Sequence, residues 1–120
     1  MDVQPHRSVR FLTPVALVGM GSGGFLLVDV REPSEVETCA YSGEIDLYYL
    51  PYAQLKRRWQ ELPRSRTLVF ACLSGKRSLR AAVYLAFKGH PDVANLEGGM
   101  RAWIDAGMPV RSEHIKINSD

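Results

Sequence analysis

The sequence has only two cysteines, Cys39 and Cys72, among its 120 residues. Two cysteines are too few for the disulfide framework of a small secreted protein, and their spacing fits neither a zinc site nor a C-x-x-C redox pair. No apolar run approaches the roughly 20 residues of a membrane-spanning helix, and Met1–His6 lacks the charged and apolar regions of a signal peptide. We therefore expect a cytoplasmic protein with no metal and no membrane partner.

The sequence also lacks an excess of charge of either sign. The formal net charge of +2 is too small to indicate a nucleic-acid partner, and the tightest basic cluster, Lys56–Arg58, is most simply a solvated helix face. The apolar fraction of 46% and the charged fraction of 23% are ordinary for a globular protein. We predict a single domain over residues 1–120, with a core at about 11–110 and polar tails.

Apolar runs typical of strands alternate along the chain with segments of helical periodicity, which predicts an α/β fold with a parallel sheet. The expected strands are residues 25–30, 45–50, 67–71 and 93–96. The expected helices are a short one from Thr13, one running towards Cys39, and residues 54–62, 78–88 and 100–106. On the helix 78–88, the residues expected to face the sheet are Leu79, Ala82, Val83, Ala86 and Phe87. Trp59 and Trp103 are expected in or beside the core.

Cys72 comes directly after an apolar strand-like run and just before a helix that we expect to begin near Ser78. Unpaired N–H groups and the helix dipole favour an anion at such a position, and here the anion would be the Cys72 thiolate. Gly75 lets the backbone bend so that several N–H groups point inward, and Lys76 and Arg77 add positive charge. A free cysteine is often an inert core residue, but this context predicts a nucleophile.

Polar residues lie at or just beyond the carboxyl ends of three of the expected strands, at the sheet edge where parallel α/β proteins bind ligands. They are Asp29 with Arg31, the segment 72–77, and Glu97 with Gly98 and Gly99. We expect one pocket to gather all three groups. Asp29 and Arg31 are interpreted as a salt-bridged pair that supports the site, and the two glycines as a tight turn.

Taken together, three stretches resemble the rhodanese-like sulfurtransferases. The resemblance implies a central, mostly parallel five-stranded sheet flanked by helices, and transfer of a sulfane sulfur through a persulfide on Cys72. The donor would be a small anion such as thiosulfate or a persulfide, and the acceptor cyanide, a thiol or a protein, without a cofactor. The matching stretches are Leu27-Val28-Asp29-Val30-Arg31-Glu32-Pro33-x-Glu35, Cys72-x-Ser74-Gly75-x-Arg77-Ser78, and Asn95-Leu96-Glu97-Gly98-Gly99-x-x-x-Trp103 with Ala106-Gly107-x-Pro109-Val110.

The resemblance also implies roles for the loop that follows Cys72. Backbone N–H groups from Leu73 to Arg77 would surround the persulfide anion. Lys76 and Arg77 would attract the donor, although an exposed Lys76 without a role is equally compatible with such a loop. Ser74 and Ser78 would donate hydrogen bonds or cap the helix, and for the Ser78 hydroxyl we favour the helix cap.

Other functions stay open at this point. Four residues separate Cys72 from Arg77, whereas phosphatase-like and arsenate-reductase-like members of the family have one more, so sulfur transfer is favoured. The Gly-His pair usual in the family is replaced by Cys39-Ala40, and Leu73 stands where thiosulfate-using members often have arginine. A binding or regulatory module without turnover is therefore the main alternative. Cys39 is most simply an idle thiol, with a role in resolving a Cys72 persulfide as a further hypothesis.

Overall fold

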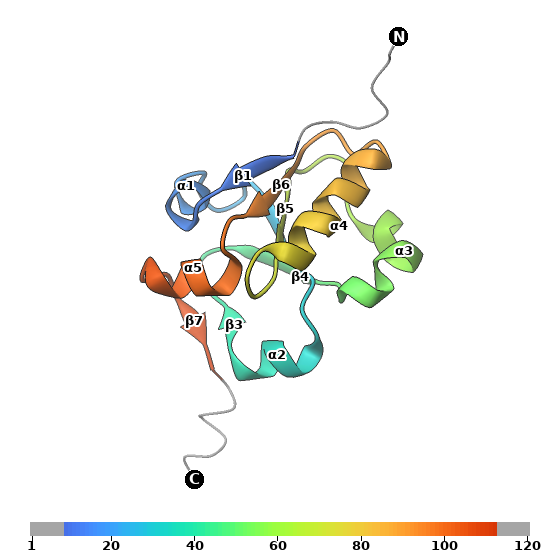
Figure 1. Ribbon diagram of the computed structural model, residues 1–120. Helices are drawn as coiled ribbons and strands as arrows, with labels where there is room; N and C mark the ends of the chain where they lie inside the picture. The colour runs from blue at the N-terminus through green and yellow to red at the C-terminus, as the bar shows by residue number, and fades with distance from the viewer. Residues whose placement is uncertain (1–8, 113–120) are drawn as a thin grey trace.

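The computed structural model describes residues 9–112, and the expected tails lie largely outside these residues. The centre of the molecule is a parallel five-stranded sheet with the order β1-β6-β5-β2-β4 (Figure 1). The predicted α/β class and five-stranded parallel sheet are confirmed. The strands of this sheet are β1 (Arg10–Leu12), β2 (Leu26–Asp29), β4 (Asp46–Tyr49), β5 (Leu68–Ala71) and β6 (Val93–Leu96).

Three strands had not been assigned from the sequence. The edge strand β1 has only three residues, and two of them are exposed, so it carries no apolar run. The other two form a separate antiparallel pair, β3 (Ala40–Tyr41) with β7 (Val110–Arg111). This pair lies beside the main sheet and connects the segment after α2 to the end of the described chain (Figure 1).

The helices begin and end close to the expected positions, with one exception. The hydroxyl oxygen of Thr13 accepts a hydrogen bond from the Ala16 amide, and Glu32 and Glu35 form a reciprocal capping box. The prediction of a continuous helix over 54–62 is wrong, because this segment consists of a short α-helix between two 3₁₀ turns. The helices are α1 (Pro14–Val18), α2 (Pro33–Thr38), α3 (Leu55–Arg58) between η1 (Tyr52–Gln54) and η2 (Trp59–Glu61), α4 (Lys76–Phe87) and α5 (Gly99–Asp105).

The sheet is buried on both faces. Alternate residues of β2 and β5 point to opposite sides, so Val28 and Phe70 pack beneath α3 and α4, while Leu27 and Val69 belong to the cluster beneath α1 and α5. Trp103 is fully buried in the second cluster and Trp59 packs partly buried against the first, as expected. Among residues 9–112, no helix combines the length and hydropathy needed to cross a bilayer.

The buried face of α4 differs from the expected one. Val83 and Phe87 are 48% and 59% exposed, although the apolar pattern had placed them on the sheet. Small side chains let the helix approach the sheet closely, and the helix therefore presents a face rich in alanine to it. The buried residues of α4 are Ser78, Ala81, Ala82, Leu85 and Ala86.

Candidate functional site

Cys72 follows the last residue of β5, at the edge where the parallel strands end. Its sulfur accepts hydrogen bonds from the amides of Gly75 (3.1 Å) and Ser78 (3.4 Å) and from the Ser78 hydroxyl (3.3 Å). Cys72 is only 1% exposed and belongs to the hydrophobic cluster beneath α4. Of the amides from Leu73 to Arg77 that were expected to surround the sulfur, that of Gly75 donates to it at hydrogen-bonding distance, while the Ser78 amide lies beyond the expected range.

The helix after Cys72 begins two residues earlier than expected, at Lys76. Gly75 is its N-cap and has φ = +97°, a left-handed conformation that glycine adopts without strain. The expectation that Ser78 caps the helix is wrong, because this residue lies inside the first turn. Its hydroxyl instead donates to the Cys72 sulfur. The early start also places Lys76 and Arg77 on the helix rather than in the loop.

The pKa of the Cys72 thiol lies below its ordinary value. Burial raises this pKa because it disfavours the charged form, but hydrogen bonds from the Ser78 hydroxyl and from the amides of Ser78, Gly75 and Ser74 lower it more. The thiolate is therefore stabilised mainly by local hydrogen bonds.

We expect Ser78→Ala to raise the pKa of Cys72 and to slow its alkylation at neutral pH about ten-fold, since a hydrogen bond to a charged group contributes about 1.5–3 kcal/mol. The rate of reaction with iodoacetamide should be measured against pH in a Cys39→Ser background. Ser74→Ala is the matched control, because its hydroxyl donates to no described residue. An unchanged pH profile in Ser78→Ala would contradict the role of this hydroxyl.

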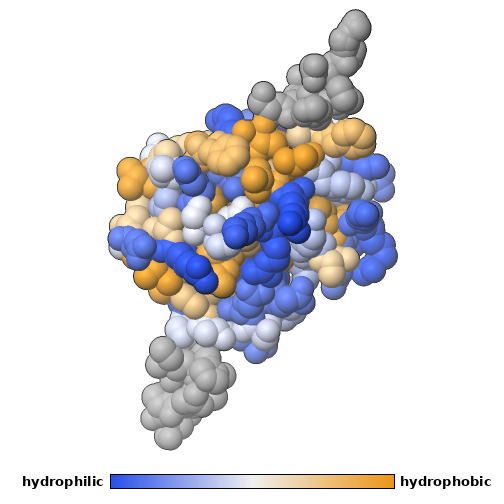
Figure 2. Space-filling model, viewed as in Figure 1, coloured by the Kyte–Doolittle hydropathy of each residue, from blue (hydrophilic) through white to orange (hydrophobic). Residues whose placement is uncertain are grey.

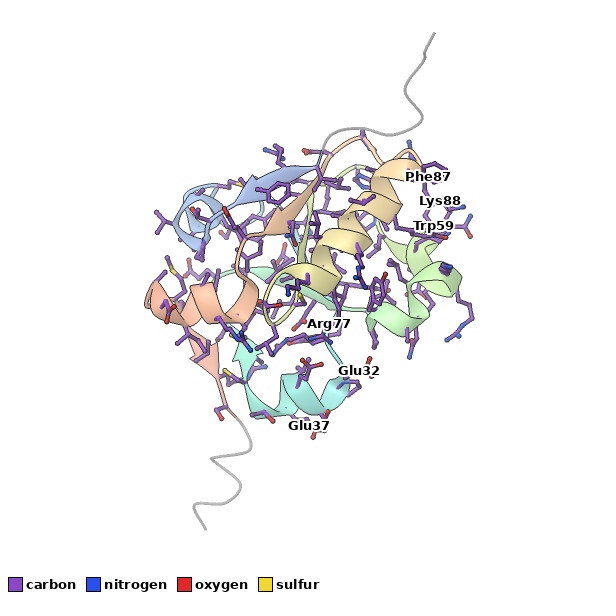
Figure 3. All side chains as sticks on the ribbon, viewed as in Figure 1. Glu32, Glu37, Trp59, Arg77, Phe87 and Lys88 are labelled. Carbon is purple, nitrogen blue, oxygen red and sulfur yellow. The ribbon has the colours of Figure 1, made fainter. Side chains whose placement is uncertain are left out.

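Arg77 does not point freely at the sulfur. Its guanidinium donates two hydrogen bonds of 2.8 Å to the Glu35 carboxylate on α2. In Figure 3 the Arg77 side chain extends from the start of α4 towards α2. The hydrogen bonds from Arg77 hold the pKa of Glu35 at about 2. The positive charge that the sequence analysis assigned to the anion site is therefore largely balanced, while Lys76 remains exposed.

The Glu35–Arg77 pair predicts an acid-dependent loss of stability. Because the pKa of Glu35 falls from about 4.5 to about 2 on folding, the pair stabilises the fold above pH 4.5 and ceases to do so as the pH falls towards 2. Urea unfolding should show wild type more stable than Glu35→Gln at pH 6, with the difference shrinking towards pH 2. Glutamine keeps the capping box, so a constant difference across this range would contradict the ion pair as its source.

Three further groups fix the backbone of the loop. The Cys72 carbonyl accepts hydrogen bonds from the Tyr41 hydroxyl (2.7 Å) and from the Met100 amide (2.9 Å). The side-chain amide of Asn95 donates to the Gly75 carbonyl (3.1 Å). Neither Tyr41 nor Asn95 was predicted to have a role, although Asn95 lies in a matching stretch. Tyr41 lies in the segment that departs from the family pattern. The residues around it in the sequence give no indication that its hydroxyl contacts the Cys72 carbonyl.

Gly99 does more than form a turn. A Cβ atom at this position would lie 2.5 Å from the Cys72 carbonyl oxygen and 2.7 Å from the Leu73 backbone. The absence of a side chain therefore lets α5 approach the loop closely enough for its amides to bind the carbonyls of Cys72 and Leu73. The neighbouring Glu97 is exposed, and no contact joins it to the sulfur.

Asp29 and Arg31 form the expected salt bridge. Both side chains are buried, and the Asp29 carboxylate accepts from Nη2 (2.8 Å) and Nε (3.0 Å) of Arg31. The guanidinium also lies 5.2 Å from the centre of the Tyr41 ring. The pair thus supports Tyr41, which in turn holds the Cys72 carbonyl.

Cys39 is a half-buried free thiol that follows the last residue of α2. It packs against the cluster beneath α1 and α5, on the opposite side of the sheet from the cluster that contains Cys72. Its role as a resolving thiol stays a prediction. Within residues 9–112, no group of three or more His, Cys, Asp or Glu side chains is arranged to hold a metal ion.

Comparison with known proteins identifies the family. The family model of the rhodanese-like domain matches residues 15–106. A protein named sulfurtransferase from Allochromatium vinosum is 41% identical over 86 residues, which cover 71% of this chain and 77% of that protein. The thiosulfate sulfurtransferase GlpE of Pseudomonas syringae is 34% identical over 80 residues, 67% of this chain and 73% of that protein.

The fold gives the same answer. The crystal structure of a rhodanese-related protein from Thermoplasma volcanium matches with a TM-score of 0.75 at 28% identity, over 85% of this chain and 97% of the other. The chain therefore belongs to the rhodanese-like domain family. Its relatives include proteins named sulfurtransferases, which supports a rhodanese-type enzyme at the level of the family.

Proposed function

We propose that the protein is a sulfurtransferase that carries a sulfane sulfur as a persulfide on Cys72. The observation that supports this most directly is the hydrogen bonding of the Cys72 sulfur, which accepts from two amides and one hydroxyl at 3.1–3.4 Å. An inert core cysteine has no need of donors directed at its sulfur, whereas a nucleophilic thiolate does.

The proposed cycle consists of two displacements at sulfur. The Cys72 thiolate attacks the outer sulfur of a donor such as thiosulfate, a new S–S bond forms, and sulfite leaves with the electron pair of the broken bond. An acceptor thiolate or cyanide then attacks the outer sulfur of the persulfide, and the Cys72 thiolate leaves. No net oxidant or reductant is consumed, and the amides around Gly75 stabilise the anion at both stages.

The charge distribution around the loop bears on the choice of donor. Arg77 is paired with Glu35, and the exposed Leu73 contributes no charge. Lys76 is the remaining exposed cation of the segment 72–77, so attraction of a small dianion is modest. A persulfide donor or a protein donor fits this site at least as well as thiosulfate. Because Cys72 is 1% exposed, any donor reaches it only after neighbouring groups shift.

Intact-mass spectrometry tests the proposal directly. The wild-type protein should gain the mass of one sulfur atom on incubation with thiosulfate or glutathione persulfide, and cyanide should remove it as thiocyanate. Peptide mapping should place the added sulfur on Cys72. A protein that hydrolyses an aryl phosphate but never gains sulfur would contradict the proposal in favour of the phosphatase-like alternative. A protein that does neither would indicate a binding module.

A further inference from the structure

An apolar groove lies between α4 and the segment formed by η1 and α3, with a volume of about 530 Å³. Val83, Tyr84 and Phe87 line it from α4, and Tyr52 and Leu55 from the opposite side. Two of these side chains, Val83 and Phe87, are the exposed residues that the sequence had placed in the core. On this side of the molecule, hydrophobic residues lie directly beside strongly hydrophilic ones (Figure 2).

The charged residues that line the groove are both cations. Lys56 comes from α3 and Arg80 from α4, and neither makes an ion pair with a described residue. A third cation, Lys88, lies 5.6 Å from the centre of the Trp59 ring and 5.5 Å from that of Tyr84. Figure 3 shows Lys88, Trp59 and Phe87 at the same corner of the molecule. The groove thus combines apolar walls with positive charge and complements an apolar segment rich in carboxylates.

The groove shares a helix with the candidate site. Residues 76, 80, 83, 84 and 87 are spaced at three and four positions, so they lie along one face of α4. This face begins at Lys76, next to the loop that binds the Cys72 sulfur. It ends at Phe87, roughly 16 Å further along the helix axis at 1.5 Å per residue. A segment docked along the face therefore has one end close to the loop.

We propose that this groove docks an acidic amphipathic segment of a partner protein that exchanges sulfur with Cys72. Apolar side chains of the segment fill the space beside Phe87 and Val83, and its carboxylates pair with Lys56 and Arg80. The exchange step rests on the function proposed above: a cysteine thiolate of the partner attacks the outer sulfur of the Cys72 persulfide, and the Cys72 thiolate leaves. Docking itself does not depend on that step.

The binding test uses a fluorescein-labelled helical peptide of about 14 residues, with leucine and phenylalanine on one face and glutamate beside them. We expect it to bind wild type at least ~10-fold more tightly than it binds Phe87→Ser or Arg80→Glu, with affinity falling as salt rises. A peptide with lysine in place of glutamate should bind weakly. Ile104 on α5 is 50% exposed, so Ile104→Ser is the control for loss of a surface apolar side chain, and Phe87→Leu should keep binding.

The transfer test adds a terminal cysteine to the same peptide and offers it to protein loaded with sulfur. Phe87→Ser and Arg80→Glu should transfer sulfur to the peptide about ten-fold more slowly than wild type, while transfer to cyanide stays unchanged. If neither wild type nor any variant loads sulfur, the proposed function is wrong. The fluorescence anisotropy of the labelled peptide then still measures docking. If loading is normal and the peptide binds every variant equally, the docking proposal is wrong.

Two further results would also overturn the docking proposal. A wild-type dimer that Phe87→Ser converts to a monomer would assign the groove to a second copy of the chain. Equal binding of the glutamate and lysine peptides would show that charge complementarity does not contribute to docking. The argument for an acidic partner segment would then fail.

Discussion

Replacing Cys72 with serine is expected to abolish sulfur loading and to lower thiocyanate formation at least ~10³-fold. A serine hydroxyl is not ionised at neutral pH and cannot take sulfur from a donor by forming an S–S bond, so the loss is chemical rather than structural. The side chain is nearly the same size, and its oxygen can still accept from the amides of Gly75 and Ser78. Intact mass and a thiocyanate assay measure both effects.

Cys39→Ser is the matched control for this substitution. It removes the other thiol of the chain, and we expect sulfur loading and transfer to cyanide to stay within about two-fold of wild type, because Cys39 is packed on the other side of the sheet. A circular dichroism spectrum equal to that of wild type would show that Cys72→Ser is folded. Sulfur loading that survives in Cys72→Ser and disappears in Cys39→Ser would assign the chemistry to Cys39 and contradict the proposal.

The sequence predicted those parts of the structure that depend on residues close together in the chain. The runs that form β2, β5 and β6 are buried on both faces, so continuous apolar stretches marked them clearly. The loop after Cys72 was predictable for a similar reason, since a glycine between a strand and a helix lets nearby amides converge on one atom. β1, β3 and β7 have two or three residues each, too few to show a periodicity.

Contacts between segments that are distant in the sequence could not be predicted from the pattern of apolar and polar residues. Arg77 was expected to face an anion, but the fold brings Glu35 to it from 42 positions away. Tyr41, 31 positions before Cys72, was likewise not connected with the loop. Both contacts depend on where α2 and β3 lie relative to β5, which is a property of the topology. The orientation of α4 has the same origin, because apolar residues surround more of the helix than the sheet covers.

Breaking the buried Asp29–Arg31 pair is expected to lower the free energy of unfolding by about 3–5 kcal/mol. Arg31 is 3% exposed, and Asp29→Ala removes the carboxylate that binds its guanidinium; a buried charge without its partner is strongly unfavourable. Urea unfolding followed by circular dichroism measures the change. Arg10→Ala, which breaks the exposed pair with Asp92, should cost no more than about 1 kcal/mol.

The double variant Asp29→Val/Arg31→Met separates loss of the pair from loss of packing. An apolar pair of similar volume needs no hydration, so most of the stability lost in Asp29→Ala should return. Sulfur loading of the double variant should nevertheless be slower than that of wild type, because methionine cannot replace the guanidinium that lies over the Tyr41 ring, and the Tyr41 hydroxyl holds the Cys72 carbonyl. A double variant that regains stability and loads sulfur as fast as wild type would show that the pair stabilises the fold without supporting the loop.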